Sequence, residues 1–189
     1  TEAGASDTFT VVLDSKPTAN VTVALSSSNT SEGTVAPASI TFTPANWNTP
    51  QTVTVTGVDD FVHDGDIAYS IVTAPATSAD PKYSGRNAAD VSATNFDDDN
   101  IGITVTPTAG LTTTEAGAAA TFTIVLDSRP AANVTIPISS SNTAEGTVSA
   151  SSLTFTPANW NVARTVTVTG VNDFVDDGDI AYTVVTAAA

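Results

Sequence analysis

Cysteine is absent from this chain of 189 residues. Its absence excludes disulfide bonds, thiolate metal sites and thiol catalysis, and it leaves the redox compartment undecided. Basic residues are scarce as well, because 5 Lys and Arg stand against 20 Asp and Glu, for a formal net charge of -15. Such a chain lacks the basic patches that bind nucleic acid or anionic lipid.

Long apolar runs are also missing. No stretch approaches the roughly 18 consecutive apolar residues that a membrane-spanning helix needs. No charged segment followed by an apolar one marks a leader, so we expect any export signal to lie outside this sequence. The hydrophobic fraction is nevertheless 41%, which is enough to form packed cores.

The sequence contains an internal repeat. Residues 1–76 and 114–189 align without a gap at an offset of 113, and 55 of these 76 positions are identical. The motif TEAG at Thr1–Gly4 returns at Thr114–Gly117, and FTPANWN at Phe42–Asn48 returns at Phe155–Asn161. A period of this length fits a whole domain rather than a solenoid repeat. The sequence therefore predicts two modules, residues 1–100 and residues 101–189.

Both predicted modules are incomplete as the sequence stands. The first begins at its TEAG motif without a preceding strand, and the second lacks a counterpart of Thr77–Asn100, which holds its C-terminal strand and Asp triplet. One explanation is that the chain is a section of a longer array. The other is that neighbouring subunits complete both ends by strand donation or head-to-tail assembly.

Short segments rich in Thr, Val and Ile, separated by turn-forming residues, predict β-strands throughout. No segment has a sustained apolar period of 3.6 residues, so we expect no helices. About seven strands in each module indicate an all-β fold of tandem antiparallel, immunoglobulin-like β-sandwiches. The predicted strands of the first module and the start of the second are Thr8–Leu13, Val21–Leu25, Ile40–Thr43, Gln51–Thr56, Ile67–Thr73, Asp90–Thr94 and Ile101–Thr106.

Acidic residues gather in a few short segments. The loop VDDFVHDGD (Val58–Asp66), its counterpart in the second module, the segment NFDDDN (Asn95–Asn100) and the two TEAG motifs hold 13 of the 20 acids, and neither loop contains Lys or Arg. Two like charges about 4 Å apart cost about 4 kcal/mol at an effective dielectric constant of about 20. Crowded carboxylates therefore favour a bound cation.

The chemistry of these residues favours calcium. Ca²⁺ takes six to eight oxygen ligands in flexible geometry, whereas Mg²⁺ usually keeps its waters and only one or two carboxylates. Zn²⁺ prefers His or Cys, and the chain has one His and no Cys. Two other interpretations compete with a metal site. Asp-rich loops can be solvated turns, and halophilic proteins are acidic too, although their acids should cover the strand faces, which here carry Thr, Ser and Asn.

In the order of these motifs the chain resembles the Calx-beta family, calcium-binding β-sandwiches of sodium–calcium exchangers and of tandem repeats in large bacterial surface proteins. The resemblance rests on TEAG, VDDFVHDGD, the terminal DDD and the junction DDDNIGI, and it covers nearly the whole chain. It implies that calcium is bound at one tip of each sandwich, near the junction to the next module. The implied ligands are Glu2, Asp59, Asp60, Asp64, Asp66, Asp97, Asp98 and Asp99 in the first module, and Glu115, Asp173, Asp177 and Asp179 in the second.

The second module departs from this pattern. Asn172 replaces the first acid of the Asp pair, and the Asp triplet has no counterpart. We therefore expect its site to be weaker or empty.

Catalysis is not expected, because a serine triad would have to use His63, which the second module lacks, and the acids lie in hydrophilic loops rather than in an apolar cleft. We expect a non-enzymatic structural repeat of an extracellular or cell-surface protein, such as an adhesin stalk or filament, in which Ca²⁺ stiffens the junction between modules. The alternative is a calcium-dependent recognition module that binds glycan or protein. A regulatory calcium sensor would need an attached transporter.

Overall fold

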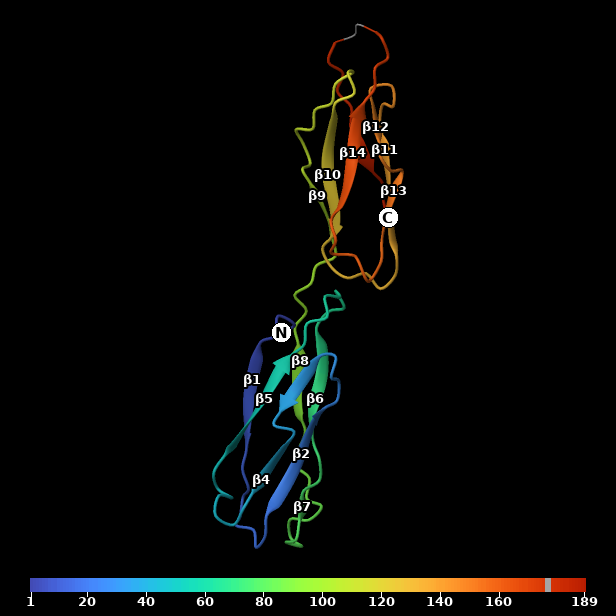
Figure 1. Ribbon diagram of the computed structural model, residues 1–189. Helices are drawn as coiled ribbons and strands as arrows, with labels where there is room; N and C mark the ends of the chain where they lie inside the picture. The colour runs from blue at the N-terminus through green and yellow to red at the C-terminus, as the bar shows by residue number, and fades with distance from the viewer. Residues whose placement is uncertain (176–177) are drawn as a thin grey trace. The chain divides into compact units, whose positions relative to one another are not determined.

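The computed structural model describes residues 1–175 and 178–189, and all of its regular structure is β-strand (Figure 1). The chain forms two compact units, Thr1–Asp60 with Asp64–Asp98 (unit 1), and Phe61–His63 with Asp99–Ala189 (unit 2). Every strand pairing is antiparallel. The described residues contain no helix that could cross a membrane. The predicted all-β, antiparallel class is confirmed.

Unit 1 is a sandwich of two sheets. One sheet has the strand order β1-β5-β3, and the other has the order β4-β2-β6-β8, with β7 paired to β2. Residues that alternate along the strands turn inward, so that Val23 and Phe42 from one sheet meet Val53 from the other in the core. The strands are β1 (Ser6–Val11), β2 (Val21–Ser27), β3 (Gly33–Ala36), β4 (Ser39–Phe42), β5 (Gln51–Gly57), β6 (Ile67–Thr73), β7 (Thr77–Ser78) and β8 (Val91–Asn95).

Unit 2 repeats the arrangement of β1–β6, with one further strand at its start. Its sheets have the orders β12-β14-β10-β9 and β13-β11-β15, and Phe122, Ile136, Phe155 and Val166 lie in the core between them. The added strand, β9, pairs with β10 and has no counterpart in unit 1. The strands are β9 (Ile103–Thr106), β10 (Ala119–Leu126), β11 (Val134–Ser140), β12 (Gly146–Val148), β13 (Ser152–Phe155), β14 (Arg164–Gly170) and β15 (Val184–Thr186).

The strand predictions differ from the structure mainly at the ends of the strands. Ile67–Thr73 is β6 with its predicted bounds, but the first strand of unit 2 begins at Ile103 rather than at Ile101, whose side chain is 80% exposed. Two strands were not predicted, β3 and β7, with four and two residues. Such short strands follow the pairing of their neighbours more than their own residue pattern.

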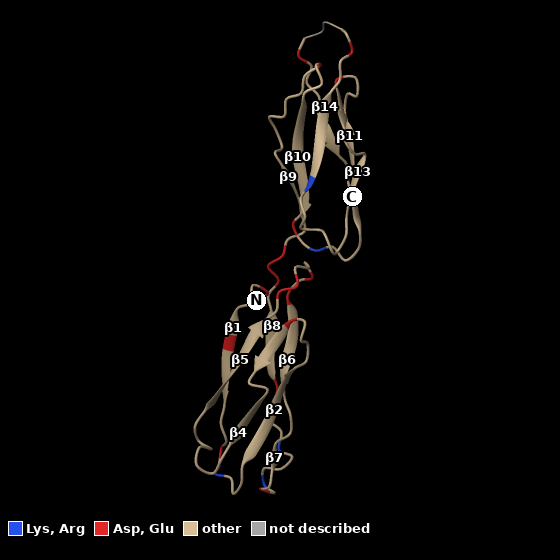
Figure 2. Ribbon diagram, viewed as in Figure 1, with Lys and Arg blue, Asp and Glu red and all other residues tan. Residues whose placement is uncertain are grey.

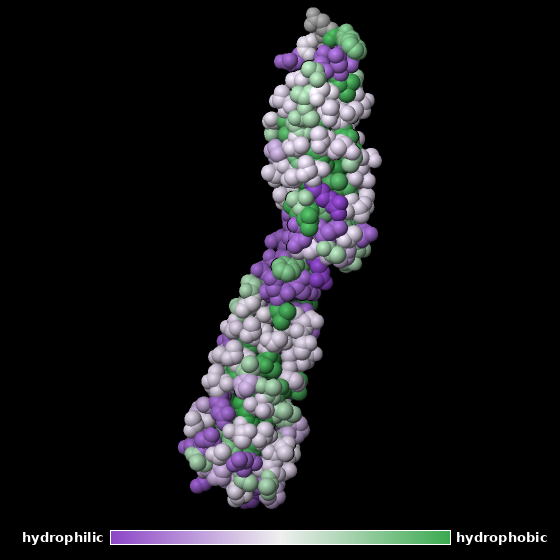
Figure 3. All heavy atoms as spheres, in the orientation of Figure 1, coloured by the Kyte–Doolittle hydropathy of each residue, from purple (hydrophilic) through white to green (hydrophobic). Residues whose placement is uncertain are grey.

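Threonine hydroxyls occupy the outward face of the β1–β5 pair. Thr8 lies opposite Thr54 and Thr10 opposite Thr52, and the same pairs recur between β10 and β14. Figure 3 shows pale, near-neutral spheres over the strands and purple ones gathered at the ends of unit 1. The uniform acidic coating that halophilic adaptation would give is therefore not seen on this face.

Candidate metal centre

Three acidic segments lie at the same end of unit 1 because of the strand pairing. β1 is antiparallel to β5, so Ser6 at the start of β1 lies opposite Thr56 at the end of β5. In the other sheet, Ile67 at the start of β6 lies opposite Asn95 at the end of β8. The TEAG turn, the β5–β6 loop (Val58–Asp66) and the segment after β8 therefore meet at one tip, where Figure 2 shows acidic residues gathered.

Two glycines place the TEAG turn. Gly4 has φ +78°, in the left-handed region that side chains disfavour, and its amide donates a hydrogen bond to the Thr1 carbonyl over 3.1 Å. A Cβ at Gly57 would lie 2.2 Å from the same carbonyl oxygen, so only glycine at the end of β5 allows the turn to pack there. The turn in this position carries Glu2 inward.

Glu2 is buried, with 1% of its surface exposed. Its backbone amide donates to the Phe96 carbonyl over 3.0 Å, which fixes the turn against the segment after β8. Its side-chain Oε2 is buried and accepts no hydrogen bond from any described residue. A buried carboxylate oxygen without a partner is costly, and such groups usually signal a missing ion or water.

Glu2, Asp60 and Asp99 offer carboxylate oxygens that all lie within 4.8 Å of one another. Asp99 directly follows Asp98, the last residue of unit 1. Oxygens bound to one Ca²⁺ at about 2.3–2.6 Å can be separated by up to about 5 Å, so the spacing suits a shared ion. The all-oxygen donor set also suits a hard cation rather than zinc.

Hydrogen bonds hold the β5–β6 loop and the segment after β8 together beside this group. The Gly65 amide donates to Asp97 Oδ2 over 2.7 Å, and the Asp97 amide donates to Asp66 Oδ1 over 3.1 Å. Within the loop, Phe61 has φ 62°, which is unusual for a bulky residue. Strain of this kind is commonly found in binding loops.

The electrostatics of the tip follow from burial and crowding. Burial is the largest of the effects that together raise the pKa of Glu2 from 4.5 to about 7, and the nearby negative charges of Asp97, Asp60, Asp64 and Glu32 follow in that order. A cation would reverse this effect, because it stabilises the ionised carboxylates. The arrangement is therefore unfavourable at neutral pH without a counter-charge.

Two further residues of this tip, Glu32 and Asn95, were not predicted from the sequence. Both are buried, and the Asn95 Nδ2 donates to Glu32 Oε2 over 3.3 Å and to the Val58 carbonyl over 2.9 Å. Burial, followed by the charge of Glu32, raises the pKa of Tyr69. A signal for Glu32 was present, since the repeat retains it as Glu145 in a second EGTV motif.

The remaining predicted ligands of unit 1 lie around the group rather than in it. Asp59, Asp64, Asp66 and Asp98 are exposed, and Asp97 is half-buried. Of these, Asp97 and Asp66 make the loop contacts already described, and Asp64 contributes to the raised pKa of Glu2.

Unit 2 presents its predicted ligands differently. Glu115 and Asp179 are exposed, and Asp173 is half-buried, with its Oδ1 accepting a hydrogen bond from the Val175 amide over 2.9 Å. Asp177 lies outside the described residues. Among the described residues of unit 2, only Asp99 belongs to a group of three His, Cys, Asp or Glu that could hold a metal ion, and that group is the one with Glu2 and Asp60.

No family model and no curated protein matches the sequence. Solved structures that match the chain include the calcium-binding domain CBD12 of CALX1.1 (14% identity, TM-score 0.41, covering 89% of this chain and 70% of that one). Another is CBD12 from CALX1.2 (14% identity, TM-score 0.42, covering 96% and 73%). The calcium binding in these titles belongs to those proteins. For this chain, the case for a metal comes from the carboxylates of its own tip.

Proposed function

We propose that the chain is a non-enzymatic, calcium-binding structural repeat, and that Glu2, Asp60 and Asp99 hold the ion. The observation that carries this proposal is the buried Oε2 of Glu2, which has no hydrogen-bond partner and lies within 4.8 Å of the other two carboxylates. Glu32 and Asp97 surround this group with further negative charge. Ca²⁺ at this position would neutralise charges that otherwise oppose one another.

The ion would crosslink three parts of the chain. Glu2 belongs to the turn before β1, Asp60 to the β5–β6 loop, and Asp99 to the segment that leaves β8 and continues into β9. Fixing Asp99 removes freedom from the last residues before the next sandwich. We therefore propose that Ca²⁺ stiffens the junction between the modules, with the Asp triplet Asp97–Asp99 as the clamped segment.

Calcium would also stabilise the folded state. A ligand that binds only the native protein adds about 2.7 kcal/mol when its concentration is about a hundred times its Kd. Extracellular calcium modules bind with Kd values of about 0.1–1 mM, which suits an environment where calcium is abundant. On this basis we place the protein outside the cell, as a stalk or filament segment whose partners are neighbouring repeats. The near-identity of the two modules supports a structural role, because a stalk needs only copies.

Calorimetric titration with Ca²⁺ tests the proposal on the whole chain. We expect saturable binding that Glu2→Gln abolishes and that Asp14→Asn leaves unchanged, since Asp14 is an exposed acid in the loop after β1. Equal binding by the parent and the Glu2→Gln variant would contradict the assignment of the site.

Small-angle scattering tests the stiffening separately. The distribution of interatomic distances should narrow when Ca²⁺ replaces chelator, and Asp99→Asn should reduce the change. If calcium binds but the scattering profile stays the same, the site stands and the mechanical role is wrong.

A further inference from the structure

Asn95 carries a buried side-chain oxygen that no described residue binds. It is the last residue of β8, its surface is 1% exposed, and its side chain lies on the covered side of the strand. No described residue donates a hydrogen bond to its Oδ1, and among the described residues of unit 1 only Glu2 Oε2 shares this condition. A buried acceptor without a donor is costly, so a partner is expected from a water or an ion.

The orientation of the Asn95 amide follows from its neighbours. Its Nδ2 donates to the Val58 carbonyl over 2.9 Å and to Glu32 Oε2 over 3.3 Å. A carbonyl oxygen can only accept hydrogen bonds, and so can an ionised carboxylate. Turning the amide over would therefore set Oδ1 against two acceptors. The two Nδ2 contacts hold Oδ1 on the side of the amide that faces away from Glu32.

The oxygen held in this way lies beside the turn that carries Glu2. A Cβ at Gly57 would lie 2.2 Å from the Thr1 carbonyl oxygen and 2.6 Å from Asn95 Oδ1, so both oxygens border the same point. The Thr1 carbonyl and the Glu2 amide belong to one peptide unit, and that amide donates to the carbonyl of Phe96, the residue after Asn95. Asn95 Oδ1 is thus a neighbour of the backbone that positions Glu2.

The groups around this point are acceptors. Asn95 Oδ1, the Thr1 carbonyl, Glu2 Oε2 and the Glu32 carboxylate all present oxygen, and the β5–β6 loop and the segment Asn95–Asn100 contain no Lys or Arg. Burial and then the charges of nearby carboxylates raise the pKa of Glu2 to about 7. A water molecule would donate to two of these oxygens and leave the negative charge unbalanced. A cation satisfies the oxygens and the charge together.

We propose that Asn95 supplies a neutral oxygen ligand to the ion of the three-carboxylate group (Glu2, Asp60 and Asp99), and that this oxygen favours Ca²⁺ over Mg²⁺. The inference rests on the proposed function. Ca²⁺ takes six to eight oxygens, amide carbonyls among them, whereas Mg²⁺ keeps several of its waters. A neutral ligand adds no repulsion to that of the carboxylates. Because the amide is already held in place, little freedom is lost when it binds.

Glu32 acts in this arrangement as a positioning residue. It is 6% exposed, and its contact with Asn95 Nδ2 is one of the two that set the direction of the amide. Glu32→Gln would offer a donor where the carboxylate accepts, so the Asn95 amide would be free to turn over. The effect of Glu32 on the ion is therefore partly indirect, through the oxygen of Asn95.

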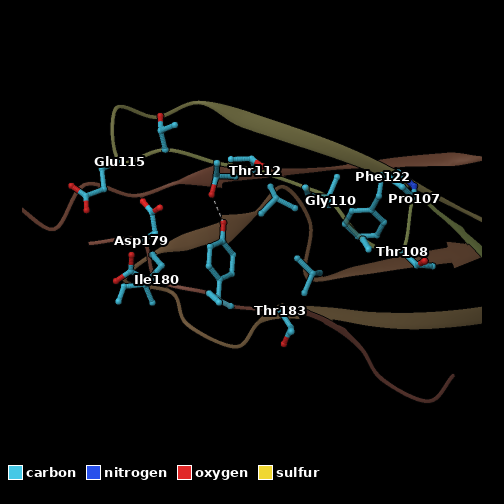
Figure 4. Close-up of a pocket in the computed structure, with 18 of the residues that line it drawn as sticks. Pro107, Thr108, Gly110, Thr112, Glu115, Phe122, Asp179, Ile180 and Thr183 are labelled. Carbon is cyan, nitrogen blue, oxygen red and sulfur yellow. Dashed lines mark hydrogen bonds between the residues drawn. The ribbon is translucent and has the colours of Figure 1, made fainter. Parts of the chain in front are cut away.

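Unit 2 contains the counterparts of the two glutamates, Glu115 for Glu2 and Glu145 for Glu32. Both line a cavity with a volume of about 1000 Å³. Figure 4 shows Glu115 and Asp179 at the same end of this cavity. The position that matches Asn95 falls after residue 189, so the inference concerns unit 1 alone.

Calorimetric titration of the full chain with Ca²⁺ and with Mg²⁺ tests the inference. Asn95→Ala should raise the Kd for Ca²⁺ by about tenfold or more, because it removes a ligand. The Kd for Mg²⁺ should change by less than about twofold, because Mg²⁺ retains water in place of this ligand. A residue that only supports the fold would weaken both ions alike. Equal rises for the two ions, or no rise for Ca²⁺, would overturn the inference.

Asn46→Ala is the matched control. Asn46 lies at the opposite end of unit 1, between β4 and β5, and its Oδ1 accepts hydrogen bonds from the Thr43 amide over 2.6 Å and from Thr43 Oγ1 over 2.9 Å. Both variants should have lower melting temperatures because both lose hydrogen bonds, but only Asn95→Ala should change the Kd for Ca²⁺. A matching loss of affinity in Asn46→Ala would assign the effect to stability, and the inference would fall.

Carbon-13 NMR of the parent protein with labelled asparagine observes the ligand directly and does not depend on a variant that folds. Saturating Ca²⁺ should move the resonance of the Asn95 side-chain carbonyl carbon, Cγ, because coordination at Oδ1 polarises the C=O bond. Mg²⁺ should move it less, and Asn46 Cγ should stay in place. In Glu32→Gln the movement of Asn95 Cγ should be smaller, and an unchanged movement would show that Glu32 does not position the amide.

The outcomes separate this inference from the function on which it rests. A parent protein that binds no Ca²⁺ contradicts the proposed function and the role of Asn95 together. A parent protein that binds Ca²⁺ while Asn95 Cγ keeps its position leaves the three-carboxylate site intact. Asn95 Oδ1 would then be bound by water, and the inference alone would be wrong.

Discussion

Units 1 and 2 share most of their sequence but differ in how they present the same glutamate. Glu2 is 1% exposed, whereas Glu115, in an identical TEAG motif, is exposed. In unit 1 the Phe96 carbonyl accepts a hydrogen bond from the Glu2 amide, whereas the position equivalent to Phe96 in the repeat falls after residue 189. The TEAG turn and the acidic loop therefore do not bury this glutamate by themselves. In unit 1 the segment after β8 supplies the contact that holds the turn.

The largest loss of stability should come from the hydrophobic core of each unit, and it should be the same in both units. Phe42 and Phe155 are both fully buried at matching positions. Phe42→Ala and Phe155→Ala should each lower the free energy of unfolding of their own unit by about 3–5 kcal/mol, through lost burial and the remaining cavity. Chemical denaturation followed by Trp fluorescence measures both. A strongly unequal loss would show that the two cores are not equivalent.

The next largest effect should be a pH dependence of stability that belongs to unit 1. Because the folded state raises the pKa of Glu2 from 4.5 to about 7, metal-free unit 1 binds a proton more tightly when folded. Its stability should therefore be greatest below about pH 4.5 and fall as pH rises to about 7, by on the order of 3 kcal/mol. Thermal melts in chelator across this range measure the fall.

Glu2→Gln is the control for this pH effect, because it removes the titrating group and keeps the shape of the side chain. The variant should lose most of the dependence between about pH 4.5 and pH 7. A parent protein in chelator that gains stability over this range would contradict the assignment.

Calcium affinity should respond to a loop carboxylate in unit 1 only. Asp60→Asn removes a charged oxygen from the three-carboxylate group and should raise the Kd for Ca²⁺ by about tenfold or more, which corresponds to about 1.4 kcal/mol. Asp173→Asn makes the same change at the matching position of unit 2 and should leave this Kd unchanged. Titration calorimetry distinguishes the two, and equal effects would move the ion away from the Glu2 group.

The smallest effect should come from a residue that positions the loop. Asp97→Asn keeps an acceptor for the Gly65 amide but removes one charge near Glu2. The Kd for Ca²⁺ should rise only a few-fold, less than for Asp60→Asn, because a screened charge near a site contributes less than a ligand. Asp97→Ala, which also removes the acceptor, should be worse than Asp97→Asn. The reverse order would show that the hydrogen bond does not matter.

Much of the fold could be predicted from the sequence because its signals are local. The β-branched, alternating segment Ile67–Thr73 became β6 with its predicted bounds, and the repeat at an offset of 113 predicted the recurring strands of the second unit. β3 was missed because GTVA is too short to show alternation and pairs only through its register with β5.

The candidate site could be predicted less completely. Asp60, Asp99 and Glu2 were predicted ligands, and the structure brings their oxygens together. The sequence could not show that Asp59 and Asp98 are exposed, because burial depends on how three distant segments meet. Asn95 was overlooked for a different reason: a neutral amide carries no charge signal, and its contact with Glu32 joins residues 63 positions apart.

The threonine-covered strand faces have a consequence for how such a chain responds to salt. A hydroxyl group stays uncharged across the whole physiological pH range, so ionic strength has little to act on along the sheets. The carboxylates, by contrast, sit mainly in loops at the ends of the strands. Each additional copy of the module would thus add uncharged strand surface and one anionic tip. The net charge would therefore grow with the number of tips and not with the area of the surface.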